Sequence, residues 1–167
     1  MAQRLTGHAR AGVILSSFCR NNWFTQAHGH GDPVYEYHSL FREFLLSHAG
    51  TVLPAEEIQR LQRSAAELLA EKGQAEDAAA LLRECADWDG LARIVLSQAP
   101  SLVAQGRFRT LEEWLRALPE NTLNDVPWLR YWMGVCRMPF DLEESASHFE
   151  SAFHEFRKRT DPAGMFL

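Results

Sequence analysis

The sequence lacks the features of membrane, secreted and disulfide-bonded proteins. It has no apolar run near the roughly 20 residues that a membrane-spanning helix needs. Its N-terminus also lacks the apolar stretch of a signal peptide. The three cysteines, Cys19, Cys85 and Cys136, are widely spaced and odd in number, which favours reduced side chains. We therefore expect a cytoplasmic protein without membrane contact.

The motifs of common enzymes are also missing. The sequence contains neither a G-x-x-x-x-G-K-[ST] phosphate loop nor a G-x-S-x-G nucleophile motif. Paired carboxylates such as Glu112-Glu113 and Glu143-Glu144 fall in first or exposed helical turns, where they indicate capping and solvation. We therefore predict that the chain is not an enzyme, has no catalytic residue and needs no cofactor.

Metal binding has one candidate segment. His28, His30 and Asp32 alternate within a stretch rich in turn-forming residues and offer two imidazoles and a carboxylate. A fourth ligand is not evident, and a turn does not fix the geometry of the three. An exposed hairpin tip is the preferred interpretation, so we predict no metal site.

The charge of the chain does not favour nucleic acid as a direct partner. The formal net charge is −5, and Arg4, Arg10 and Arg20 are the only lysines or arginines before Arg42. Contact with phosphates usually takes a dense basic stripe. We therefore expect no direct binding of nucleic acid.

The sequence does contain a pattern that recurs every 33 or 34 residues. In each copy, small or apolar residues at helical spacing are followed by a glycine or proline and then by a second apolar helix. Such a hairpin cannot bury its apolar face alone and has to stack on a copy of itself. The pattern predicts an all-α array over residues 51–167, with repeats at about 59–91, 92–125 and 126–159 and the start of another.

The first fifty residues differ from the repeats. Residues 8–20 have a helical apolar pattern, and a further helix is expected from Ser39 onward. Between them, two short segments alternate in the manner of strands around a turn-rich stretch, which predicts one β-hairpin at about residues 23–37. We therefore expect a small separate module over residues 1–50.

The repeats and the first fifty residues each resemble a known family. The repeats resemble tetratricopeptide repeats, with the small position of the first helix at Ala66, Ala99 and Met133 and the turn at Gly73, Gly106 and Pro139. The segments Leu5-Thr6-Gly7, Asn22-Trp23-Phe24 and Tyr35 to Leu45 resemble a junction in MalT-like, LuxR-family ATP-dependent transcriptional regulators. In that family a winged-helix module leads into a tetratricopeptide-like superhelix. The resemblance implies a partial winged helix over residues 1–50, with ATPase and DNA-binding domains attached if the chain is part of a longer one.

Arginine is unevenly distributed over the repeats. On the hairpin template, one inner wall includes five arginines, Arg60, Arg63, Arg93, Arg130 and Arg137. Guanidinium forks hold carboxylates and phosphates through two-point contacts. We therefore expect this wall to receive an acidic or polar ligand or peptide. The alternative is a solvated helix face with local pairs such as Arg63–Glu67.

The sequence thus predicts a binding module. The preferred function is a sensor or protein-interaction segment of a cytoplasmic transcriptional regulator, in which the helical-repeat surface binds a protein or small-molecule effector. The alternative is a stand-alone helical-repeat scaffold for protein–protein interaction, unrelated to transcription.

Overall fold

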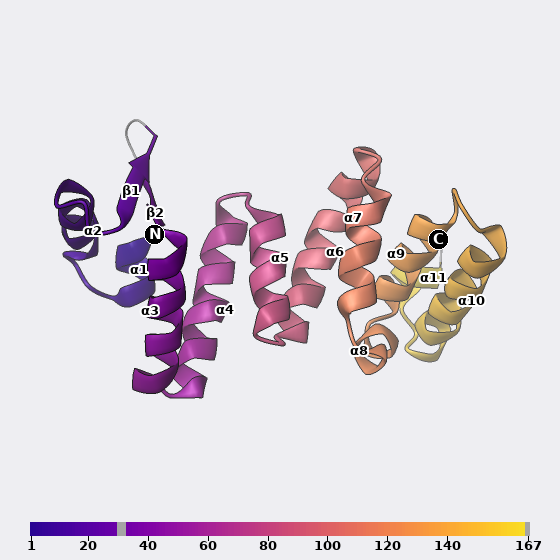
Figure 1. Cartoon of the computed structure of the whole chain (residues 1–167). Coiled ribbons are helices and arrows are strands. Elements are labelled where there is room, and N and C mark those ends of the chain that lie inside the picture. Colours follow the sequence, from indigo (N-terminus) through magenta and orange to yellow (C-terminus); the bar gives the residue numbers. More distant parts are fainter. Residues whose placement is uncertain (30–32, 166–167) are drawn as a thin grey trace. The chain divides into compact units, whose positions relative to one another are not determined.

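The computed structural model describes residues 1–29 and 33–165 of the chain. These residues form eleven helices and one two-stranded sheet, labelled in chain order in Figure 1. Internal contacts divide the chain into two compact units, Met1–Leu68 and Leu69–Leu167. The prediction of a mostly helical fold with one β-hairpin near its start is confirmed.

The first unit combines helices with the β-hairpin. Two helices precede the hairpin and two follow it, with the bounds α1 Ala2–Thr6, α2 Ala11–Arg20, α3 Ser39–Val52 and α4 Ala55–Glu71, and the last three residues of α4 belong to the second unit. Strands β1 (Thr25–His28) and β2 (Val34–Tyr37) pair antiparallel, with Thr25 opposite Tyr37. Helix α1 was not expected from the sequence. Gly7, with a left-handed φ of 67°, separates it from α2.

The first strand begins later than the sequence pattern predicts. The pattern places its start at Trp23, but β1 starts at Thr25. Asn22 and Phe24 have φ values of 53° and 50°, so the chain turns at both residues and is not extended there. Phe24 remains 65% exposed and its ring packs on Phe41 at 5.6 Å. The local turn therefore shortens the strand and presents an aromatic side chain to solvent.

Residues 69–165, the described part of the second unit, contain helices and no strand. Their bounds are α5 Ala75–Glu84, α6 Trp88–Ala104, α7 Phe108–Ala117, α8 Glu120–Asp125, α9 Pro127–Arg137, α10 Leu142–Lys158 and α11 Pro162–Met165. Helix α6 packs on α5, α7 and α9, and α9 packs most extensively on α10 (Figure 1). The helices of one hairpin are thus covered by those of the next.

Glycines and side-chain caps set the ends of these helices. Gly73 and Gly106, predicted as repeat turns, have left-handed φ values of 77° and 70°. The Asp87 carboxylate accepts a hydrogen bond from Gly90 N at 3.0 Å and caps α6. The Asp141 carboxylate accepts from Glu144 N at 2.9 Å and caps α10.

The recurring small and apolar positions form the core of this unit. The repeated second-helix positions that are buried are Ala78, Leu82, Cys85, Leu111, Leu115, Leu118, Ser145 and Ala152. Cys85 and Cys136 are buried free thiols, and burial, together with the nearby Glu112 charge, raises the pKa of Cys136 to about 12. A thiol with so high a pKa is an unreactive core group.

Helices α9 and α10 approach each other closely at Gly134. Ser145 Oγ donates a hydrogen bond to Gly134 O at 2.8 Å, and Ser145 is buried. A Cβ atom at position 134 would lie 2.8 Å from Cε1 of the Phe149 ring. The backbone of α9 therefore approaches α10 more closely than a residue with a side chain allows.

We predict that Gly134→Ala destabilises the protein, whereas Gly50→Ala does not. The new methyl group at position 134 has to displace the Phe149 ring, and overpacking of this kind costs about 1–3 kcal/mol. At position 50, inside α3, no atom lies within 4 Å of the new Cβ, so the gain in helix propensity of roughly 0.5–1 kcal/mol remains. Thermal or urea unfolding of both variants tests the prediction. Equal shifts of the same sign would contradict it.

Candidate ligand-binding site

The five arginines predicted to line one wall fall in both units. Arg60 and Arg63 belong to the first unit, and Arg93, Arg130 and Arg137 to the second. Arg60 is exposed and forms a two-point pair with Glu57, with Nε–Oε2 and Nη2–Oε1 distances of 2.8 and 2.5 Å. This hydrogen-bonded pair lowers the pKa of the Glu57 carboxyl. Arg63 is also exposed.

The three arginines of the second unit differ in their surroundings. Arg93 is exposed on α6 and has no ion pair among the residues that the structure describes. Arg130 and Arg137, both on α9, are only 18% and 20% exposed at the side chain and are paired with carboxylates. Ligand binding by the five arginines stays a prediction, and Arg130 lines a pocket.

Arg130 joins α9 to the short helix α8. Its Nη2 donates hydrogen bonds to Glu120 Oε1 and, at 2.9 Å, to Asn124 Oδ1. Its Nε is buried and has no hydrogen-bond partner within residues 1–29 and 33–165. A buried donor without an acceptor is costly, and a ligand acceptor could pair with it only if the Arg130 side chain moved toward the pocket.

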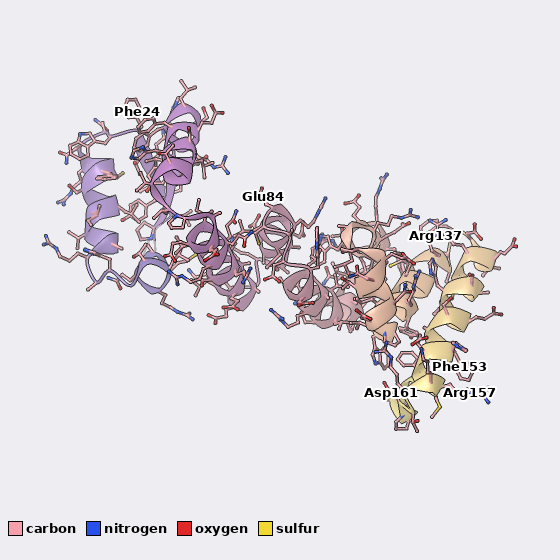
Figure 2. The ribbon with its side chains drawn as sticks, turned by 90° about the horizontal axis from the view of Figure 1, so that it is seen from below. Phe24, Glu84, Arg137, Phe153, Arg157 and Asp161 are labelled. Atoms are coloured by element: carbon pink, nitrogen blue, oxygen red, sulfur yellow. The ribbon has the colours of Figure 1, made fainter. Side chains whose placement is uncertain are left out.

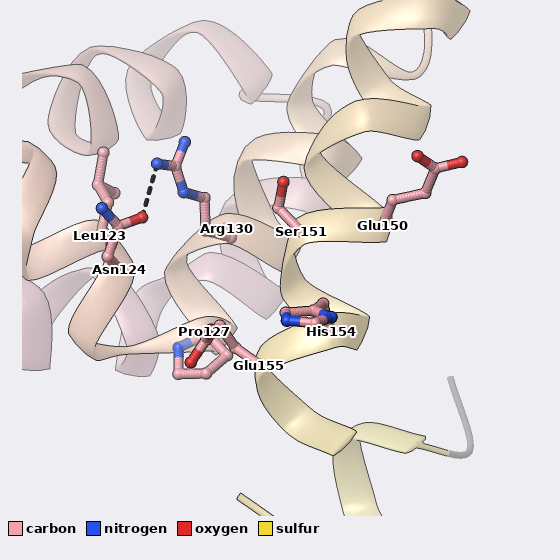
Figure 3. Close-up of a pocket in the computed structure, with 8 residues that line it drawn as sticks. All are labelled: Leu123, Asn124, Pro127, Arg130, Glu150, Ser151, His154 and Glu155. Carbon is pink, nitrogen blue, oxygen red and sulfur yellow. Dashed lines mark hydrogen bonds between the residues drawn. The ribbon is translucent and has the colours of Figure 1, made fainter. Parts of the chain in front are cut away.

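The pocket around Arg130 has a volume of about 390 Å³ and lies between α8, α9 and α10. Its walls combine polar groups with two apolar side chains, and the lining residues are Leu123, Asn124, Pro127, Arg130, Glu150, Ser151, His154 and Glu155. Figure 3 shows these side chains, with the Arg130–Asn124 hydrogen bond dashed. The pocket is therefore lined by both positively and negatively charged side chains.

Arg159 fixes one edge of this pocket. It follows α10 and donates to the carbonyl oxygens of Asp125 and Asn124, at 2.7 and 3.1 Å. These carbonyls lie at the end of α8, where they have no partner within the helix. Arg159 thus ties α8 to the end of α10, while Arg130 ties it to α9.

A cluster of ion pairs lies between α7, α9 and α10. Arg137 Nη1 donates to Glu112 Oε1 at 3.2 Å, and Arg137 Nε lies 2.5 Å from Glu144 Oε2. Glu112 also accepts from Arg116 at 2.8 Å. His148 lies 3.8 Å from Glu144 and is 18% exposed. Arg137 therefore has a structural role, joining one hairpin to the next.

Several pocket residues were not identified from the sequence. Asn124 lies on α8, which was not predicted, because a polar six-residue helix has no apolar stripe to reveal it. His154 and Glu155 lie on the polar side of α10, which the periodicity indicates only as solvated. Of the lining residues, the sequence analysis singled out Arg130.

Of the three candidate metal ligands, His30 and Asp32 lie outside the described residues, and His28 Nε2 lies 3.3 Å from Glu36 Oε2. Residues 1–29 and 33–165 contain no group of three or more His, Cys, Asp or Glu side chains suited to hold a metal ion. In the same residues, no helix has the length and apolar character needed to cross a bilayer.

The beginning of the chain is similar to a known protein family. Residues 1–57 match the family model of the MalT winged helix domain. No solved structure gives a significant match to the chain. The match covers α1 to α3 and the β-hairpin, and it supports a MalT-like relationship for this part of the chain.

We predict that Arg137→Ala lowers the melting temperature more than Arg60→Ala does. Loss of Arg137 leaves the mostly buried Glu112 without its α9 partner, whereas Arg60 and Glu57 form an exposed pair within one helix. The two arginine deletions change the net charge equally, so Arg60→Ala is a matched control in thermal unfolding. A larger loss of stability in Arg60→Ala would contradict the assignment.

The stability of the protein should depend on the protonation of His148. Burial, reinforced by the Arg130 charge, lowers the pKa of His148 below its ordinary value of 6.5, although Glu144 acts in the opposite direction. The unfolded chain therefore takes up this proton first as the pH falls. The stabilising contribution is complete above about pH 6.5 and is lost as the pH falls toward the folded-state pKa.

The measurement is the melting temperature from about pH 7.5 to about pH 5, for wild type and for His148→Gln. We expect acidification to destabilise wild type more than the variant. His154→Gln, at an exposed position of the same helix, is the control and should follow wild type. Parallel pH profiles for wild type and His148→Gln would refute the prediction.

Proposed function

We propose that residues 69–167 bind a protein or small-molecule effector within a MalT-like, LuxR-family transcriptional regulator. The pocket around Arg130 is the proposed contact, and the repeats are proposed to be tetratricopeptide-like. The winged-helix match at residues 1–57 supports the regulatory context. Attached ATPase and DNA-binding domains, and a cytoplasmic location, are part of the same proposal.

The observation that carries this proposal is the composition of the pocket. Arg130 offers a guanidinium with an unsatisfied Nε, and Glu150 is an exposed carboxylate without an ion pair among the described residues. Ser151 and Asn124 add groups that both donate and accept hydrogen bonds. A ligand that suits this set is polar and carries an acidic group for Arg130 and a donor for Glu150.

The surroundings favour binding over catalysis. Arg130 donates a hydrogen bond that fixes α8 to α9, and the Ser151 hydroxyl donates to the Ser147 carbonyl oxygen at 2.9 Å, so its proton is held by the backbone of α10. A ligand held between α8 and α10 would favour one arrangement of the last hairpin over others. In a regulator, such a bias is the means by which a bound effector alters the attached domains.

We predict that glutamate and the tripeptide Glu-Ser-Lys bind at this pocket and that Arg130→Lys weakens both. Lysine keeps the charge but cannot form the two-point contact with a carboxylate, so affinity should fall about tenfold. Backbone chemical shifts of the ¹⁵N-labelled chain measure the binding, and the perturbed amides should map to α8, α9 and α10.

Arg93→Lys is the matched control, because Arg93 is exposed and lies outside the pocket. This variant should bind both probes as wild type does. Perturbations elsewhere in the chain, or equal weakening by the two substitutions, would contradict the proposal. The coding sequence around this segment tests the regulatory context, since a phosphate loop upstream and a helix-turn-helix downstream are expected.

A further inference from the structure

A second pocket of the helical unit lies among α5, α6 and α7, three helices that follow one another in Figure 1. Its volume of about 450 Å³ is in the range of small-molecule sites, and it shares no residue with the pocket around Arg130. Carboxylates, amides, a hydroxyl, a guanidinium and an indole all contribute to its walls. We refer to it as the α5–α7 pocket.

This pocket lies where α6 departs from the repeat pattern. Its wall includes Gln98 and Ser101 on α6, whereas the first helices of the neighbouring repeats have apolar residues at the equivalent positions. The equivalent pairs are Ala65 and Leu68 in α4, and Trp132 and Val135 in α9. Leu68 and Val135 are buried, but Ser101 is exposed. Positions that the other repeats use for packing thus line a hollow in this one.

Two polar side chains in the wall lack hydrogen-bond partners within residues 1–29 and 33–165. One is the half-buried amide of Gln98, and the other is the indole of Trp114, a residue only 6% exposed. Trp114 Nε1 is not fully enclosed, so its donor reaches the hollow that the residue lines. An acceptor supplied by a ligand gains free energy by pairing with a nearly buried donor of this kind.

The charges of the pocket do not cancel. Arg107 Nη2 donates to Glu76 Oε1 at 2.6 Å and to Thr110 Oγ1 at 3.3 Å, so the guanidinium and one carboxylate neutralise each other. Asp77 has no ion pair in the part of the chain that the structure describes, and its contact is a long hydrogen bond of 3.4 Å from Gln74 Nε2. The pocket therefore has one negative charge in excess.

These groups together indicate the chemistry of a ligand. The Asp77 carboxylate only accepts hydrogen bonds and favours a cationic donor such as a primary ammonium group. The Gln98 amide both donates and accepts, which matches another amide, and the Trp114 N–H needs an acceptor such as the carbonyl of that amide. An anionic ligand is disfavoured by the excess charge.

We propose that the α5–α7 pocket binds a small amine that also carries an amide, with its ammonium group on Asp77 and its amide at Gln98 and Trp114. This proposal goes beyond ligand binding at Arg130 and does not depend on it, because the two pockets are lined by different residues.

The test compares L-glutaminamide, L-glutamine and L-glutamate, which share one carbon skeleton and carry net charges of about +1, 0 and −1 at about pH 6.5. Backbone amide shifts of the ¹⁵N-labelled full chain measure the binding, and those perturbed in common should map to α5, α6 and α7. L-glutaminamide should bind about tenfold more tightly than L-glutamine, and L-glutamate should bind here least tightly, since each added carboxylate lies near Asp77.

Two variants test the assigned roles. Asp77→Asn should weaken L-glutaminamide about tenfold and abolish its advantage over L-glutamine. Gln98→Leu, which restores the apolar character of the equivalent positions, should weaken all three probes without lowering the melting temperature. A structural role for Gln98 alone would lower that temperature and leave binding unchanged.

Glu84→Gln is the matched control for Asp77→Asn. Glu84, labelled in Figure 2, is an exposed carboxylate at the other end of α5 and lies outside the pocket, so this variant should bind as wild type does. No binding of L-glutaminamide, perturbed amides outside α5 to α7, or an unchanged order of affinities in Asp77→Asn would overturn the proposal. Failure of the probes at the Arg130 pocket, seen as unperturbed amides in α8 to α10, would leave it standing.

Discussion

A helical hairpin in the second unit can bury its apolar side only against the next hairpin, and the other features of the unit follow from that constraint. Helix α6 shows it most clearly, because Leu91, Val95 and Ala99 are fully buried where it packs on α5, α7 and α9. Burying side chains of the size of leucine or valine contributes about 1.5–3 kcal/mol each. No single hairpin offers enough such surface to fold alone.

The same constraint explains where the polar groups gather. Polar side chains at a joint between hairpins have to be paired, and Arg137 meets this need by bridging Glu112 on α7 and Glu144 on α10. The pocket around Arg130 lies beside the short helix α8, where small and polar side chains leave space unfilled. On α9, Arg137 thus joins neighbouring hairpins, whereas Arg130, seven residues earlier, lines the candidate ligand pocket.

Much of the fold could be predicted from the sequence, and less of the site. The repeat period identified the buried positions, such as Leu111 and Ala152, because burial of one helix face imposes a regular spacing. It did not reveal α8, whose residues have no such spacing. Nor did it reveal the pairing of Arg137 with Glu112, since residues 25 positions apart meet only through the packing of two hairpins. Local rules predict pairs within a helix, such as Arg63–Glu67, and not those between helices.

Native-state hydrogen exchange on Leu111→Ala tests mutual burial of the hairpins most directly. Leu111 is fully buried in α7, and its truncation costs about 2–5 kcal/mol. If the hairpins depend on one another, the slowest amides of α9 and α10 lose the same opening free energy as those of α6 and α7. Loss of protection confined to α6 and α7, with α9 and α10 unchanged, would show that the hairpins are independent and would contradict the account.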